Sequence, residues 1–169
     1  LMSNIDVRTF SVGEGLPPAL EQYARYTREE VFTIFGRQTA NKKMRGCVSG
    51  VFAIKELNTE LLFVTLNKSD KDFSPSTMYE DYVVSETQFH WKSQNTDTHE
   101  GRGKRFVEQS VNKKKFVLFV RESKRDAWGN TSSFYCFGLV DYICSRDDRP
   151  MSIDWRMHQP ILPQFVSAV

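Results

Sequence analysis

The sequence predicts an α+β fold in which an N-terminal helical hairpin precedes a strongly bent antiparallel sheet or a small β-barrel. Two observations support this. Residues 17–36 carry the start and stop signals of two short helices, and after Gly50 the apolar residues fall into short β-type runs separated by polar turns. A chain of 169 residues has the size of one domain. We therefore expect a single domain, with residues 1–45 as helical hairpin and loop and residues 46–169 as the β-rich body.

The first helix is expected over residues 19–26, because Pro17 and Pro18 suit a helix start, where the missing N–H has no intrahelical partner. The second begins at Thr27, which together with Glu30 has the spacing of a capping box. It is expected to end at Gly36, a residue typical of helix C-termini.

The β-rich body begins with a hairpin formed by residues 51–55 and 61–66, joined by a turn at residues 58–60. The second of these strands is apolar on both faces, so it is expected to lie in the centre of the sheet. A short helix is expected over residues 105–111. Further strands are expected over residues 79–84, 89–93, 116–120, 134–145 and 151–157. Short antiparallel strands of this number close most readily into a barrel or a bent sheet.

The cysteine content argues against a disulfide framework and against a zinc site. The chain has three cysteines, Cys47, Cys136 and Cys144, with no C-x-x-C pair. No apolar run reaches the ~18 residues of a membrane span, and the first residues lack a signal-peptide core. We expect a cytoplasmic protein without a metal or other cofactor.

Positive charge is concentrated in one stretch of the chain. Residues 102–125 contain nine basic and two acidic residues, whereas the whole chain has a net charge of only +2. Such asymmetry suggests a basic face on a more acidic body, which favours nucleic acid as a partner; a solvated charge run is the alternative. The predicted phosphate-binding residues are Lys68, Arg102, Lys104, Arg105, Lys113, Lys114 and Lys115.

Residues 61–82, from Leu-Leu-Phe-Val-Thr-Leu-Asn-Lys-Ser-Asp-Lys-Asp-Phe-Ser-Pro to Tyr-Glu-Asp-Tyr, closely resemble a bacterial domain of unknown function. Further matches follow in register at residues 27–31, 85–94, 119–122 and 149–156, so the resemblance covers roughly residues 20–160. That domain is found C-terminal to DEAD/DEAH-type helicases and phospholipase-D-like nucleases, in DNA defence or restriction-type proteins. This chain has no P-loop. The resemblance therefore implies DNA recognition, with a helicase or nuclease domain of the parent protein as partner.

By analogy with small barrels appended to restriction nucleases, we expect the domain to read a modified base or backbone. A flipped base needs an aromatic ring for stacking, polar groups for its Watson–Crick edge and cations for the flanking phosphates. Residues 67–94 supply all three. The predicted base-recognition residues are Asn67, Asp72, Tyr79, Asp81, Tyr82, Trp91 and Ser93, although core packing is the alternative for Tyr82 and Trp91.

Two other functions remain open. Glu122 and Lys124 follow an apolar strand and, with Asp81 or Asp72, would resemble the carboxylate–lysine site of metal-dependent nucleases. Trp128 lies in a polar loop and could anchor a protein partner, which would make the domain a docking module. His90 lies in strand-like sequence and is expected to be a core or hydrogen-bonded histidine rather than a catalytic one.

Overall fold

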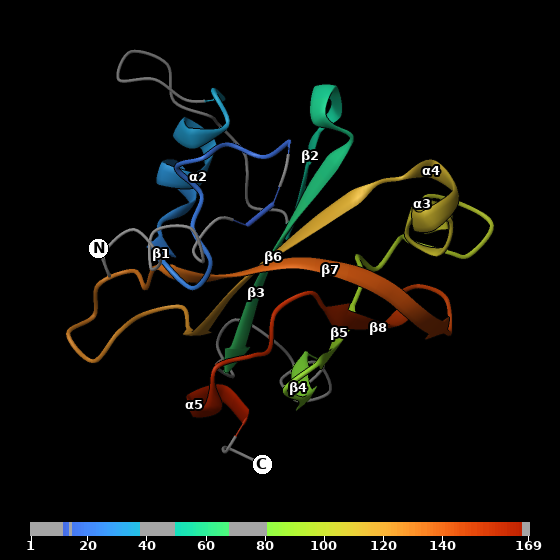
Figure 1. The fold of residues 1–169 in the computed structure, drawn as a ribbon. Helices are drawn as coiled ribbons and strands as arrows, with labels where there is room; N and C mark the ends of the chain where they lie inside the picture. The colour runs from blue at the N-terminus through green and yellow to red at the C-terminus, as the bar shows by residue number, and fades with distance from the viewer. Residues whose placement is uncertain (1–11, 14, 38–49, 68–80, 167–169) are drawn as a thin grey trace.

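The computed structural model describes residues 12–13, 15–37, 50–67 and 81–166, and it shows a mostly β protein built on one open, mixed sheet (Figure 1). The strand order is β2-β3-β6-β7-β8-β5-β4, and β1 pairs with β7. The strands are β1 (Arg25–Tyr26), β2 (Val51–Ile54), β3 (Thr59–Asn67), β4 (Tyr82–Ser85), β5 (Gln88–Lys92), β6 (Lys115–Ser123), β7 (Phe134–Arg146) and β8 (Ser152–Met157). The α+β prediction with a helical hairpin is therefore wrong.

The sheet is not a barrel and not antiparallel throughout. β3 and β6 pair in parallel, from Thr59 opposite Lys115 to Asn67 opposite Ser123, while the other pairs are antiparallel. A parallel pair needs a long crossover connection. That connection contains β4, β5 and the short helices α3 (Lys104–Val107) and α4 (Gln109–Asn112). β2 and β4 end the strand order without pairing to one another, so the described strands leave the sheet open.

The second expected helix is confirmed as α2 (Arg28–Ile34). Thr27 Oγ1 accepts a hydrogen bond from the Glu30 amide at 3.1 Å, and the Glu30 carboxylate accepts one from the Thr27 amide at 2.9 Å. This is the capping box expected from the sequence. Gly36 follows with a φ of 73°, a left-handed conformation that ends the helix at little steric cost.

The first expected helix is wrong because the chain around it is tied to β7 instead. Tyr23 has a φ of 62°, its amide donates to the Cys136 carbonyl at 2.7 Å, and the Cys136 amide donates to Ala24 at 2.9 Å. The Gln22 side chain donates to the Phe137 carbonyl at 2.7 Å and occupies the space above Gly138, where a β-carbon would collide with it. Residues 25–26 consequently form β1 and not a helical turn.

The central strands β3 and β6 are buried on both faces, as expected for β3 from its continuous apolar sequence. One face, which includes Leu62 and Leu118, packs against Trp91 and Trp155 of β5 and β8 and against α5 (Pro163–Val166). The other face packs against α2 and the segment before it, with residues Leu20, Val31, Phe32, Leu61, Phe63 and Phe119. The hairpin expected at the start of the β-rich body is confirmed as β2–β3.

No helix in the described ranges has both the length and the apolar character needed to cross a membrane.

Candidate nucleic-acid interface

A row of four side chains crosses the outer face of β4, β5, β8 and β7. Tyr82 lies opposite His90, His90 opposite Asp154, and Asp154 opposite Cys144 in the strand register. The Tyr82 ring stacks on the His90 imidazole, with centroids 4.7 Å apart and planes 27° apart. His90 Nδ1 lies 2.8 Å from Asp154 Oδ1, and the Cys144 thiol donates to Asp154 Oδ2 at 3.4 Å. The expectation that His90 is a hydrogen-bonded histidine is confirmed.

This row holds an exposed aromatic ring in a fixed position. Tyr82 is 46% exposed, whereas His90 beneath it is only 3% exposed. Burial opposes ionisation of Asp154, but the hydrogen bonds from His90 and Cys144 together outweigh it, so the pKa of this carboxyl is lowered. The ionised carboxylate anchors His90, and His90 in turn supports the Tyr82 ring. An exposed ring that is supported on one face in this way is suited to stacking on a base.

The other predicted base-recognition residues are not gathered around Tyr82. Trp91 is 4% exposed and packs in the core against Phe106 and Trp155, so no base can stack on it in this conformation. Asp81 and Ser93 are buried and bind backbone: Asp81 Oδ1 accepts from the Lys92 amide at 2.8 Å, and Ser93 Oγ accepts from the Met151 amide at 2.9 Å. Asn67 is exposed at the end of β3. Asp72 and Tyr79 lie outside the described residues, as does Lys68 from the predicted phosphate-binding set.

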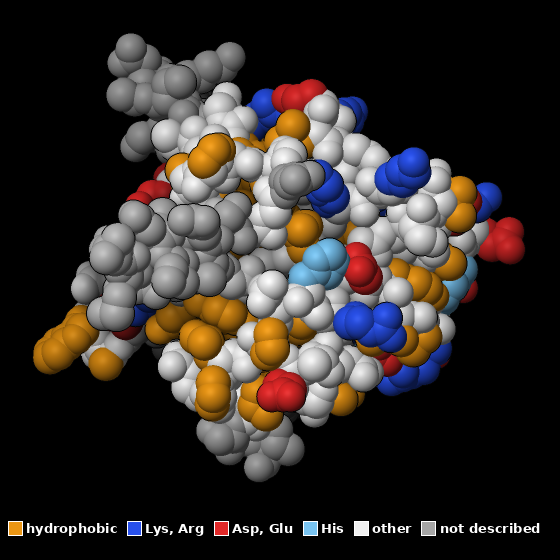
Figure 2. Space-filling model, viewed as in Figure 1, with side chains coloured by type: hydrophobic (Ala, Val, Ile, Leu, Met, Phe, Trp, Pro, Cys, Tyr) orange, Lys and Arg blue, Asp and Glu red, His pale blue; other side chains and the backbone are white. Residues whose placement is uncertain are grey.

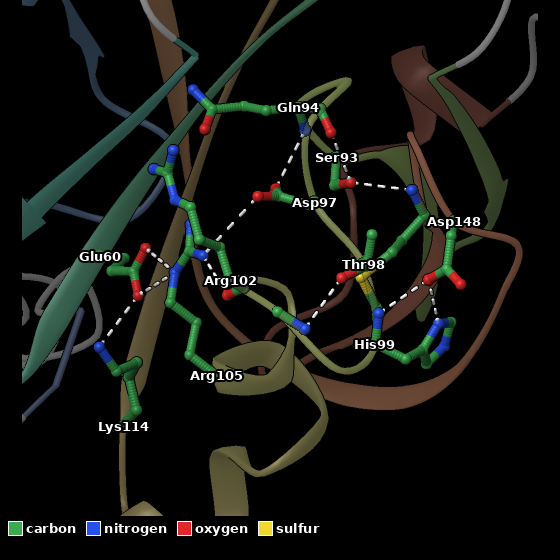
Figure 3. A network of polar contacts seen from close by, with 12 residues as sticks. Glu60, Ser93, Gln94, Asp97, Thr98, His99, Arg102, Arg105, Lys114 and Asp148 are labelled. Carbon is green, nitrogen blue, oxygen red and sulfur yellow. Dashed lines mark hydrogen bonds and ion pairs between the residues drawn. The ribbon is translucent and has the colours of Figure 1, made fainter.

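Near the first residues of β3 and β6, an almost completely buried carboxylate, Glu60, holds two of the predicted phosphate-binding cations. Glu60 accepts hydrogen bonds from Arg105 Nε on both of its oxygens and from Lys114 Nζ, all at 2.9 Å. Arg105 Nη1 also lies 3.9 Å from Asp97, which is fully buried. Figure 3 shows these side chains converging from β3, from α3 and from the segment before β6. Arg105 and Lys114 therefore brace α3 and α4 against the sheet.

The segment between β5 and α3 is fixed to the turn between β7 and β8. The His99 amide and its Nδ1 both contact Asp148 Oδ1, at 2.7 and 2.9 Å (Figure 3). His99 Nε2 lies 2.7 Å from Ser145 Oγ, and the Arg149 amide donates to the Asp97 carbonyl at 2.9 Å. The two hydrogen bonds from His99 lower the pKa of Asp148. These contacts anchor the start of α3.

The helical corner that is braced in this way presents four of the predicted phosphate-binding cations. We define the α3–α4 corner as Arg102, Lys104, Lys113 and Lys114. Arg102, Lys104 and Lys113 are exposed, and Lys104 forms a 3.7 Å ion pair with Glu108. Lys115 starts β6, and its Nζ lies against Gly15. A cavity of about 310 Å³ opens between the corner and β7, lined by Val107, Gln109, Ser110, Lys113, Lys114, Asp141 and Tyr142.

On the face seen in Figure 2, the basic residues of the described ranges do not form one continuous patch. Figure 2 shows Lys and Arg side chains spread over the right half of the visible face, with Asp and Glu side chains among them. The fold brings Glu60 and Asp97 from other parts of the sequence to Arg105 and Lys114. The strong positive charge of residues 102–125 is therefore partly neutralised in the folded protein.

The residues of the alternative nuclease site are not brought together. Glu122 and Lys124 lie at the end of β6, whereas Asp81 immediately precedes β4, and β7, β8 and β5 separate these strands in the sheet. Within the described ranges, no three His, Cys, Asp or Glu side chains are grouped so that they could hold a metal ion. Asp72, the other carboxylate considered, lies outside these ranges.

The loop between β6 and β7 carries Trp128, whose side chain is 87% exposed. In Figure 1 this loop projects from the left side of the molecule, away from α3 and α4. The residues around Trp128 are polar or small: Lys124, Arg125, Asp126, Ala127, Gly129, Asn130 and Thr131.

These features define a small, mostly β domain with a supported aromatic ring on its outer sheet face and a braced basic corner. The chain belongs to the family described as domain of unknown function DUF3427, whose family model matches residues 20–167. No curated protein matches the chain. Membership of a domain family of unknown function is thereby confirmed, while the association with helicase and nuclease domains stays a prediction.

Glu60 and Asp154 organise the two surfaces, and neither is among the residues predicted from the sequence. Asp154 gives one recognisable signal, since residues 152–156 alternate polar and apolar, which places Asp154 on an outer face. Glu60 appears in the sequence as part of a turn. Only the parallel pairing of β3 with β6 brings it beside Lys114.

Proposed function

We propose that this domain binds DNA without cutting it and supplies target recognition to a parent protein with helicase or nuclease activity. The observation that carries the proposal is the Tyr82 ring, 46% exposed and stacked on a His90 side chain that Asp154 fixes. Maintaining an exposed aromatic in one orientation lowers the entropy lost when a base stacks on it. The preference we propose is for an unpaired or modified base, because such bases are the least costly to take out of a duplex.

The α3–α4 corner supplies the phosphate contacts in this proposal. Arg102, Lys104 and Lys113 are exposed, and the Glu60 network holds the helices that carry them. Lys92 adds a cation on the outer face of β5, two residues from His90 and therefore on the same side of the strand. Phosphate contacts position a DNA-binding protein, while the contact at Tyr82 selects the base.

The test is binding of the purified domain to duplex and single-stranded DNA, each plain, base-modified or backbone-modified, at two salt concentrations. We expect salt-sensitive binding with a preference for a probe that offers an unpaired or modified base. Tyr82→Ala should remove that preference, with a loss of roughly five- to hundredfold on the preferred probe. Tyr82→Phe should retain it, because the ring remains. Absence of binding to every probe at low salt would overturn the proposal.

A further inference from the structure

Trp128 is presented by a loop that is already ordered. Asp126 Oδ1 accepts hydrogen bonds from the amides of Trp128 and Asn130, both at 2.9 Å. The Asp126 amide donates to the Asn130 carbonyl at 2.8 Å, and the Gly129 amide donates back to the Asp126 carbonyl at 3.1 Å. Gly129 takes a φ of 83°, which a side chain would disfavour, and thereby closes the turn. The indole is thus held out from a closed turn, so a ligand would meet it with little ordering cost.

The surroundings of Trp128 are cationic rather than apolar. Arg125 lies at the base of the loop, where its Nη1 donates to the Gly129 carbonyl at 3.2 Å, and it forms no ion pair with any residue in the described ranges. Arg25 donates from Nε to Ser133 Oγ at 3.1 Å at the same base, again with no ion pair inside those ranges. An exposed indole on a loop with two guanidinium groups at its base, neither in an ion pair with a described residue, suits a polyanion that offers flat rings. Trp and Arg are enriched at protein interfaces as well, which makes protein docking the alternative outcome of the test.

We infer that Trp128 stacks on an unpaired nucleobase and that Arg25 and Arg125 contact the phosphates on either side of it. This inference rests on the proposed function and adds a second base contact, distant from the α3–α4 corner. Lys113 and Lys114 precede β6, and Trp128 follows it, so the nine residues of β6 separate them. At about 3.3 Å per residue that separation is about 30 Å, the length of roughly nine base pairs. A single nucleic acid longer than about 30 Å can therefore contact both ends of β6 at once.

The fluorescence of the protein reports this contact directly. The chain has three tryptophans, and Trp91 and Trp155 are 4% and 0% exposed, so quenching by acrylamide reports mainly on Trp128. A saturating 20-nucleotide single-stranded DNA should protect the emission from acrylamide. Trp128→Ala should weaken binding of this DNA by roughly five- to hundredfold, whereas Trp128→Phe should retain most of the affinity. Asn130→Ala is the matched control in the same loop, because only the backbone of Asn130 forms hydrogen bonds there.

The outcomes separate this inference from the proposed function. Suppose that the wild-type domain binds DNA, but that DNA does not protect the emission from acrylamide and Trp128→Ala binds DNA as tightly as the wild type. The inference is then overturned and the proposed function stands. If the wild-type domain binds no DNA, both are overturned. If Trp128→Ala abolishes a self-association seen by sedimentation and leaves DNA binding unchanged, Trp128 is a protein-docking residue and the inference is again overturned.

Discussion

Glu60 accepts hydrogen bonds from Arg105 Nε on both carboxylate oxygens at 2.9 Å, although the Glu60 side chain is only 2% exposed. The contact joins a residue of the central sheet to the helix that opens the α3–α4 corner. Lys114 Nζ shares the same carboxylate, so one buried anion pairs with two cations from the two ends of the helical segment. This carboxylate therefore helps to hold the corner against the sheet, together with the hydrogen bonds that join Gln109 to Val140 and Tyr142.

Glu60→Gln should destabilise the domain by about 3 kcal/mol, because removal of the buried carboxylate leaves Lys114 and Arg105 partly buried with only Asp97, 3.9 Å from Arg105, as counter-charge. Urea unfolding followed by circular dichroism measures the change. Glu56→Gln is the matched control: Glu56 also pairs with an arginine, Arg37, but that pair is exposed and its loss should leave the midpoint of unfolding unchanged. Equal midpoints for the two variants would show that the buried network does not stabilise the fold.

Trp91→Ala should reduce the free energy of unfolding by about 3–5 kcal/mol, the usual cost of truncating a buried aromatic residue. The Trp91 ring packs edge-on against Phe106 at a centroid distance of 5.3 Å and lies 6.2 Å from Trp155. Trp91→Phe keeps most of this packing and should bind every DNA probe as the wild type does. If folded Trp91→Phe lost the preference for an unpaired or modified base, Trp91 would belong to the recognition surface and not to the core.

Tyr82 and Trp91 show that the sequence alone could not distinguish a surface aromatic residue from a core one. Both are aromatic residues in β-type sequence with polar neighbours, so the pattern alone leaves stacking and core packing open for each. The structure separates them through strand alternation: Trp91 points to the inner face and Tyr82 to the outer one. The faces could be assigned only once β5 was known to lie between β4 and β8, which is a long-range pairing.

The elements that follow from local signals were predicted correctly, and those that depend on distant contacts were not. The capping box of Thr27 and Glu30 and the β2–β3 hairpin are local, and both are confirmed. Residues 19–26 have a good helical composition, but hydrogen bonds to Cys136 and Phe137, more than 100 residues away, override it. The parallel pairing of β3 with β6, which makes the sheet mixed, leaves no local signal either.

The stabilising contribution of Asp154 should be lost at acidic pH. Hydrogen bonds from His90 and Cys144 lower the pKa of Asp154 despite its burial, so the ionised form stabilises the folded state at neutral pH. That contribution is present above the ordinary carboxyl pKa of about 4 and is lost as the pH falls through the lower pKa of the folded state. Asp154→Asn should therefore be less stable than the wild type at pH 7, and the difference should shrink towards pH 3. Chemical unfolding at a series of pH values measures it, and an offset that stays constant with pH would contradict the assignment.

The salt dependence of DNA binding should identify the phosphate contacts of the α3–α4 corner. Lys113 is exposed and has a φ of 53°, so Lys113→Asn removes the charge with a residue that tolerates this left-handed conformation. If Lys113 contacts a phosphate, the slope of log K against log salt for duplex DNA should become shallower by about 0.9. Glu108→Gln is a control with the opposite expected effect on DNA affinity. It removes the acid that pairs with Lys104 at 3.7 Å and should therefore strengthen DNA binding at low salt. Slopes that do not change in Lys113→Asn would place the phosphate contacts elsewhere on the domain, since a cation outside the interface releases no counterions when DNA binds.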